Sequence, residues 1–180
     1  MGTTTTLVTV QEFLALPEIE GQRMELIGGE VVTMGRGGAG HEWVKANLIL
    51  LLAAWVKDNP ALKLLSEATF LLDDHNSPIP DVSLLSRSRK PSDMSGWFKG
   101  APDVAIEVVS SEKAAHLEAK IELYLRHGGK SVWVVYPVHQ VVWIYDSSGK
   151  ARKFERDQTL EDPTVLPGFN IPVSAIFEGI

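Results

Sequence analysis

The chain has 180 residues, of which 44% are hydrophobic and 22% charged, a mix typical of a globular protein with its own core, so we expect one domain over residues 1–180. Because it contains no cysteine, disulfide bonds and thiolate metal sites are excluded, which is consistent with a reducing cytoplasm. The formal net charge of −6 argues against a protein that coats nucleic acid through bulk charge, although metal ions can neutralise an acidic site that handles phosphates.

The first predicted elements are a short helix and a β-hairpin. Thr9 and Glu12 have the spacing of a capping box, and the helix that they begin ends before the proline that follows. Two short apolar runs then flank Gly28 and Gly29, and two glycines can both adopt the positive φ of a type I′ turn. The sequence therefore predicts a hairpin over residues 23–34.

A long helix comes next, and nothing around it indicates a membrane protein. Residues 41–57 are strongly apolar on one side, which predicts a buried helix. The longest apolar run, residues 48–56, is too short to cross a bilayer. Residues 1–13 lack the basic and apolar segments of a signal peptide. We therefore expect a cytoplasmic protein without membrane contact.

Three predicted strands and a second helix form the middle of the chain. The strands cover residues 61–73, 78–87 and 101–110, and the near-continuous apolar run of the third suggests that both of its faces are covered. The helix begins after a cap at Ser110 or Ser111 and ends at a pair of glycines.

Two more strands, over residues 131–137 and 140–146, follow that helix. Residues 163–180 are predicted to be coil interrupted by prolines, with a short terminal helix. The order of helix, three strands, helix and strands predicts an α/β fold, a mixed α+β sheet flanked by helices.

Three polar residues lie where packing alone would not place them. Asp81 starts a strand directly after a proline, Glu107 interrupts a buried apolar strand, and Lys120 lies at the edge of the apolar stripe of the next helix. Two carboxylates on neighbouring strands can bind a hard cation such as Mg²⁺, and the backbone carbonyl of Val108 can add a third oxygen. Two acids, a divalent cation and a lysine are suited to phosphodiester hydrolysis.

Each of these residues also has an ordinary structural explanation. Asp81 can be a turn residue at the entry to a strand, and Glu107 can form a salt bridge on an edge strand. Lys120 can be a solvated lysine, as most lysines at a helix edge are. The three together favour a functional site more than any one of them alone.

The segments "PIPDVSLLS" and "APDVAIEVVSSEKAAHLEAKIELYLRHGGKSVWVVYP", with the earlier "MELIGGEVV", resemble the Uma-two family of proposed restriction endonucleases. This family is a domain of unknown function within the PD-(D/E)XK nuclease superfamily. The resemblance extends over nearly the whole chain. It implies a restriction-endonuclease-like αβββαβ core behind the N-terminal hairpin, and a divalent-metal nuclease site acting on DNA.

The resemblance also implies roles for individual residues. Asp81 matches the motif aspartate and Glu107 the motif acid, with Mg²⁺ or Mn²⁺ as the cation. The usual motif lysine is replaced by Val109, and Lys120 matches the helical position to which some branches have moved it. An upstream acid often joins such sites, and Glu30, in the family's Gly-Gly-Glu position, is favoured over Glu42.

Several further residues are candidates for contact with substrate. His41 begins a helix after a glycine-rich loop, where it can touch phosphate, cap its own helix or pack locally. His116 lies one turn before Lys120. Trp97 and Phe98 can stack on bases, cover the core or contact a second copy. A basic patch that can contact the DNA backbone, or simply keep a loop soluble, consists of Arg87, Arg89, Lys90 and Lys99.

The sequence thus predicts a metal-dependent endonuclease that cuts DNA, with a homodimer as a plausible assembly because cutting both strands commonly needs two sites. A catalytically degenerate nuclease fold that binds nucleic acid or a protein partner is the alternative. A toxin-like nuclease controlled by a partner is a third hypothesis, which the sequence does not distinguish.

Overall fold

The computed structural model of the chain describes residues 7–17, 19–35, 37–91, 93, 95–110 and 114–180. A six-stranded mixed sheet with the order β10-β9-β8-β7-β5-β3 forms its centre. The strands β7 and β8 are parallel, and all other neighbours are antiparallel. The strands of this sheet are β3 (Leu62–Ser66), β5 (Val82–Ser86), β7 (Val104–Val108), β8 (Ser131–Tyr136), β9 (Val141–Asp146) and β10 (Ala151–Phe154).

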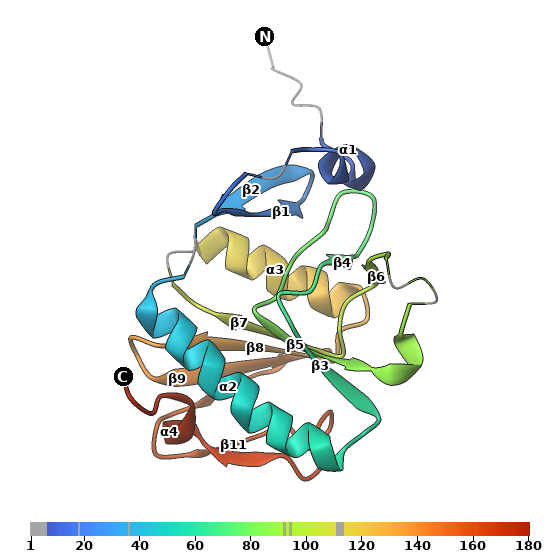
Figure 1. Cartoon of the computed structure of the whole chain (residues 1–180). Helices are drawn as coiled ribbons and strands as arrows, with labels where there is room; N and C mark the ends of the chain where they lie inside the picture. Colours follow the sequence, from blue (N-terminus) through green and yellow to red (C-terminus); the bar gives the residue numbers. More distant parts are fainter. Residues whose placement is uncertain (1–6, 18, 36, 92, 94, 111–113) are drawn as a thin grey trace.

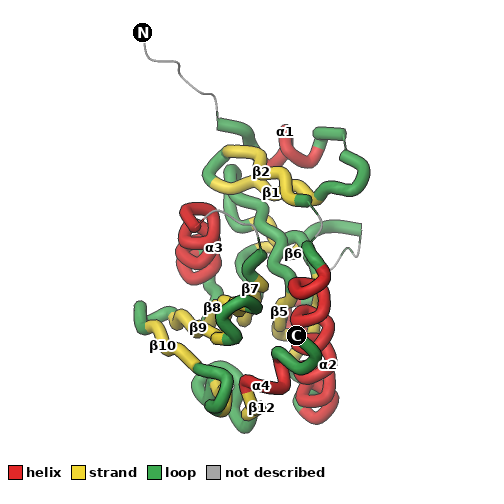
Figure 2. Tube along the Cα trace, turned by 90° about the vertical axis from the view of Figure 1, so that its left-hand side faces the viewer, coloured by secondary structure: helices red, strands yellow, loops and turns green. Residues whose placement is uncertain are grey.

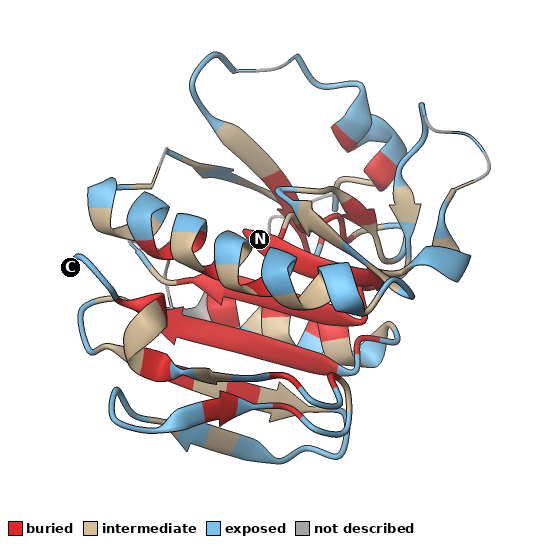
Figure 3. Cartoon of the chain, turned by 60° about the horizontal axis from the view of Figure 1, so that its bottom comes forward, coloured by how far each residue is buried: buried red, intermediate tan, exposed pale blue. Residues whose placement is uncertain are grey.

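Two helices cover opposite faces of this sheet, as the two perpendicular views show (Figures 1 and 2). The helix α2 (Ala39–Asp58) packs Leu48 and its neighbours against one face, and α3 (Ala114–Arg126) packs Tyr124 and its neighbours against the other. The central strands between them are largely buried (Figure 3), and every residue of β7 is buried. A parallel pair needs such cover, and the prediction that both faces of β7 are covered is confirmed.

The N-terminal helix α1 (Val10–Leu14) has the predicted capping box. The Glu12 amide donates to the Thr9 side chain at 3.3 Å, and the Thr9 amide donates to the Glu12 carboxylate at 2.8 Å. These two bonds satisfy backbone groups that the first turn of a helix leaves without partners.

The predicted hairpin is also present, as β1 (Arg23–Ile27) and β2 (Glu30–Met34). Gly28 and Gly29 both have positive φ, at 60° and 76°, as a two-residue turn of this kind requires. The hairpin is a separate two-stranded sheet that contacts α3 rather than an extension of the central sheet.

The predicted strand over residues 61–73 is broken in the structure. After β3 ends, Glu67 adopts a φ of 50°, and β4 (Phe70–Leu71) pairs with β6 (Phe98–Lys99) instead of continuing in the central sheet. A non-glycine residue with positive φ does not continue a strand. The amide of Glu67 donates to the carbonyl of Asp81 at 3.2 Å, so the break places a second acid beside the predicted site.

The C-terminal segment is more ordered than predicted. The expected terminal helix is present as α4 (Val173–Ile176), but the expected coil contains β12 (Asn170–Pro172), which pairs with β11 (Thr159–Glu161). Residues of this hairpin and of α4 join the core on the α2 side of the sheet, so burial rather than local propensity orders them.

The predicted fold class is confirmed: α2, β3, β5, β7, α3 and β8 follow one another as an αβββαβ core in a mixed sheet. The predicted cap of α3 at Ser110 or Ser111 depends on residues 111–113, which lie outside the described part of the chain. No helix within the described ranges is both long and apolar enough to span a membrane.

Candidate active site

Two acids from separate strands meet at one end of the central sheet. Asp81 directly precedes β5, and Glu107 lies near the end of β7. Because β5 and β7 are antiparallel, the start of one lies beside the end of the other. The Asp81 Oδ2 atom accepts a hydrogen bond from the amide of Val108 at 2.8 Å. The sheet topology therefore positions both carboxylates side by side.

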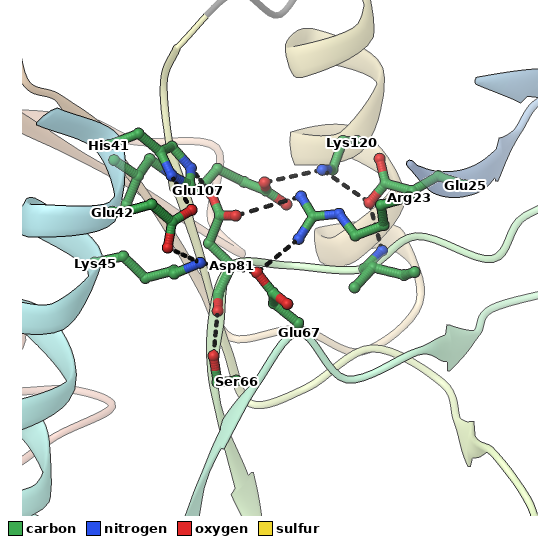
Figure 4. Close-up of polar contacts among 12 residues, drawn as sticks. Arg23, Glu25, His41, Glu42, Lys45, Ser66, Glu67, Asp81, Glu107 and Lys120 are labelled. Atoms are coloured by element: carbon green, nitrogen blue, oxygen red, sulfur yellow. Dashed lines mark hydrogen bonds and ion pairs between the residues drawn. The ribbon is translucent and has the colours of Figure 1, made fainter. Parts of the chain in front are cut away.

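Glu107, the acid inside the apolar strand, is bound by two residues of α3. The ammonium of Lys120 lies 2.8 Å from Glu107 Oε2 (Figure 4). The Tyr124 hydroxyl donates to Glu107 Oε1 at 2.8 Å. Lys120 and Tyr124 are one helical turn apart and therefore share a face. The Lys120 ammonium also lies 3.1 Å from Glu25 Oε1 of β1. The side chain of Lys120 is only 1% exposed, so this is a buried ion cluster.

Asp81 is paired with two other positively charged or chargeable groups. The guanidinium of Arg23 is 3.3 Å from Oδ1, and Nε2 of His41 is 3.2 Å from Oδ2. Burial raises the pKa of the Asp81 carboxyl, but the hydrogen bonds of His41 and Val108 and the charges outweigh it and lower that pKa to about 2. The bond to Asp81 raises the pKa of His41, despite the opposing effect of burial.

Further charged residues lie around Asp81 and its partners. The Lys45 ammonium lies 2.7 Å from Glu42 Oε2 and 2.8 Å from Glu67 Oε1, and Arg23 also approaches Glu67 at 3.5 Å. The hydrogen bond from Lys45 lowers the pKa of Glu42. The groups line a cleft of about 1040 Å³ formed by the hairpin, α2, α3 and the ends of β5 and β7.

The contact between His41 and Asp81 predicts a specific pH dependence of stability in metal-free buffer with EDTA. The pKa of His41 is raised above its ordinary 6.5, so its contribution is complete below pH 6.5 and is lost as the pH rises through the raised value. The pKa of Asp81 is lowered from 3.8 to about 2, so its contribution is complete above pH 3.8 and is lost on acidification toward pH 2.

The free energy of unfolding of wild type minus that of His41→Gln should therefore be largest between pH 3.8 and 6.5. Urea unfolding across pH 3 to 9, read by circular dichroism, measures this difference. His139→Gln changes an exposed turn histidine and is the matched control. A difference that stays constant across the whole pH series would contradict the prediction.

The structure brings the predicted site residues to one cleft, and both candidates for the upstream acid, Glu30 and Glu42, line it. Asp81, Glu107, Lys120, His41 and Val108 all line the cleft. Glu30 lines it too, yet its side chain forms no hydrogen bond or ion pair with another described residue. Glu42 contacts His41 and Lys45.

Sequence reasoning missed the acid that contacts Lys120, which is Glu25, and it also missed Arg23. A signal for both exists in the sequence. Side chains alternate along a strand, so Arg23 and Glu25 project from the same face of β1. Tyr124 is a further contact of Glu107, and its spacing of four residues from Lys120 places it on the same face of α3.

Of the other residues predicted to contact substrate, some line the cleft and others do not. His116 lines the cleft. The basic patch predicted to contact DNA does not line it: the 3₁₀ turn η1 (Arg87–Arg89) follows β5, whereas Asp81 precedes it, so they lie at opposite ends of that strand. Phe98 stacks on Phe70 inside the fold, with ring centroids 5.3 Å apart, and Trp97 is exposed.

Asp81 and Glu107 offer carboxylate oxygens, the kind of donor that a hard divalent cation needs. Within the described residues, no group of three or more His, Cys, Asp or Glu side chains is arranged to hold a metal ion. Mg²⁺, however, is typically bound through one or two carboxylates together with water. Asp81, Glu107 and the carbonyl of Val108 provide hard oxygen donors of this kind at the end of β7. The donor chemistry therefore fits Mg²⁺ or Mn²⁺ once Arg23 releases Asp81 Oδ1.

A mixed sheet between two helices, with two acids and a lysine where its central strands end, defines the restriction-endonuclease-like class of fold. A crystal structure of "a putative nuclease belonging to DUF820 from Anabaena variabilis ATCC 29413" is similar, with a TM-score of 0.83 and 26% identity over 94% of this chain and 97% of that one. The chain belongs to the family described as "Uma2: Putative restriction endonuclease", whose model matches residues 10–174. The family resemblance seen in the sequence is thus confirmed. No curated protein matches the sequence.

Proposed function

We propose that the protein is a metal-dependent endonuclease that hydrolyses DNA phosphodiester bonds. The observation that carries this proposal is the buried Lys120 ammonium, 2.8 Å from Glu107, beside a second carboxylate on the neighbouring strand. Family membership and the nuclease-fold neighbour support it. The cleft is the place for the substrate, because it contains both acids, Lys120 and the partly exposed cations around them.

Asp81, Glu107 and the Val108 carbonyl would hold Mg²⁺ or Mn²⁺. A divalent cation held there supplies positive charge beside the scissile phosphate and makes a nearby water more acidic. Lys120 donates a hydrogen bond to the attacking water or to the phosphate oxygen that gains charge. Glu25 positions the ammonium of Lys120, and Tyr124 fixes the Glu107 carboxylate. His41, at the cleft, can contact a neighbouring phosphate.

Calorimetric titration with Mn²⁺ tests the proposal. Wild type should bind Mn²⁺ at millimolar concentration or below, and Asp81→Asn should not bind, because it removes a charged oxygen donor. The matched control is Asp103→Asn, which changes an equally buried aspartate at the opposite end of β7 and should leave Mn²⁺ binding intact. Absence of Mn²⁺ binding by wild type would overturn the proposal.

One observation favours the alternative of a nuclease fold that binds without cutting. Both oxygens of Glu107 and both oxygens of Asp81 already have partners in the protein, so these two carboxylates are satisfied without a cation. In that case, DNA binding should be the same in EDTA and in Mn²⁺, and plasmid nicking should be absent under both conditions.

A further inference from the structure

The cations around the acids differ in how firmly they are held. Lys120 lies between Glu107 and Glu25 at 2.8 and 3.1 Å and is almost fully buried. The guanidinium of Arg23 lies 3.3 Å from Asp81 and 3.5 Å from Glu67, and its side chain is 26% exposed. Charge-assisted hydrogen bonds are typically about 2.7–2.9 Å long. Lys120 is therefore built into the fold, whereas Arg23 is held loosely at the wall of the cleft.

The position of Arg23 allows it to leave Asp81 without unfolding anything. It is the first residue of β1, in a hairpin that is separate from the central sheet. Its second partner, Glu67, has a side chain that is about half exposed and is also paired with Lys45. The release of Arg23 therefore leaves Glu67 paired with Lys45 and uncovers the Oδ1 atom of Asp81.

Asp81 Oδ1 is the oxygen more readily offered to a hard cation, because its partner among the described residues is Arg23 alone. The other oxygen, Oδ2, contacts His41 and accepts from the Val108 amide. A guanidinium and a divalent cation carry charge of the same sign, so they repel each other and cannot share this oxygen at close range. Arginine is also well suited to phosphate, because its planar fork of donors matches two phosphate oxygens. Once displaced, the guanidinium remains inside the cleft in which we place the substrate.

We propose that Arg23 occupies Asp81 in the metal-free protein, competes there with the divalent cation, and binds a backbone phosphate of DNA once the cation has displaced it. This inference rests on the proposed nuclease function and assigns Arg23 two opposed effects. Arg23 weakens metal binding and strengthens DNA binding. A residue that merely supports the fold would weaken both when it is replaced.

The test combines Arg23→Gln with two measurements. In Mn²⁺ calorimetry, Arg23→Gln should bind more tightly than wild type, by roughly 3- to 10-fold in Kd, because the internal competitor is gone. In fluorescence anisotropy with a short duplex DNA in Ca²⁺, Arg23→Gln should bind the DNA more weakly than wild type. The slope of log K against log salt concentration should become shallower by about 1, the change expected for loss of one phosphate contact.

Two further variants control the test. Arg23→Lys retains the charge and should show intermediate Mn²⁺ affinity with the salt slope of wild type. Arg126→Gln removes an exposed arginine that pairs with Glu122 on α3, and it should change neither measurement. Urea unfolding of each variant verifies that it is folded.

The outcomes separate this inference from the function on which it rests. If wild type fails to bind Mn²⁺, the nuclease proposal itself falls. If wild type binds Mn²⁺ but Arg23→Gln binds it equally well or more weakly, Arg23 is not a competitor and only the present inference is overturned. An unchanged salt slope in Arg23→Gln likewise overturns the assigned phosphate contact.

Discussion

Replacement of Lys120 by methionine is expected to lower the free energy of unfolding by about 3–5 kcal/mol. Methionine fills a similar volume but removes the charge that lies between the Glu25 and Glu107 carboxylates. The two buried acids would then face each other without the Lys120 charge between them, which favours uptake of a proton by one of them at neutral pH. Urea unfolding at pH 7 measures the loss.

A surface lysine provides the matched control for this substitution. Lys153 also lies 2.8 Å from a carboxylate, that of Glu155, but both side chains are exposed. Lys153→Met should therefore change the free energy of unfolding by less than about 1 kcal/mol. Equal losses in the two variants would show that burial of Lys120 does not matter to stability.

Lys120 is also the residue whose loss is expected to have the largest effect on cleavage. To separate catalysis from folding, Lys120→Met is combined with Glu25→Gln, which removes one of the two carboxylates that Lys120 contacts. The double variant should be more stable than the sum of its single losses predicts, because the two residues are in contact. Its plasmid-nicking rate in Mn²⁺ should fall at least about 100-fold, as is typical when a hydrogen-bond donor to developing charge is lost.

The single variant Glu25→Gln is the control for cleavage. It retains Lys120 and the contact between Lys120 and Glu107, so nicking should persist at a reduced rate. Mn²⁺ binding should survive in the double variant, because Asp81 and Glu107 are unchanged. Nicking by the double variant at the rate of Glu25→Gln would exclude Lys120 from the reaction.

Much of the fold follows from local sequence patterns. The paired glycines of the first hairpin, the capping box at Thr9 and the apolar run of β7 each identify an element from a few adjacent residues. The break after β3 cannot be identified in this way, because Glu67 adopts a positive φ that its residue type disfavours. The amide of Glu67 also bonds to Asp81, which is distant in the sequence. The C-terminal hairpin was missed for a similar reason: it is ordered by burial against the core.

The candidate site shows the same division between local and distant information. Asp81, Glu107 and Lys120 stand out because each conflicts with its surroundings in the chain, and the structure brings all three to one cleft. Arg23 and Glu25 cause no such conflict, since charged residues are ordinary in a short hairpin strand. Their importance depends on where the hairpin docks, which alternation within the strand alone does not specify.

The ion pair between Glu25 and Lys120 joins residues that are 95 positions apart in the chain. Contacts of such long sequence separation contribute stability only after a large loop has closed, which costs chain entropy. The first hairpin therefore completes the cluster only when it docks on a helix from the second half of the protein. The contact between Lys120 and Glu107 spans only 13 positions and does not need the hairpin, so docking of the hairpin adds Glu25 to a pair that α3 and β7 form by themselves.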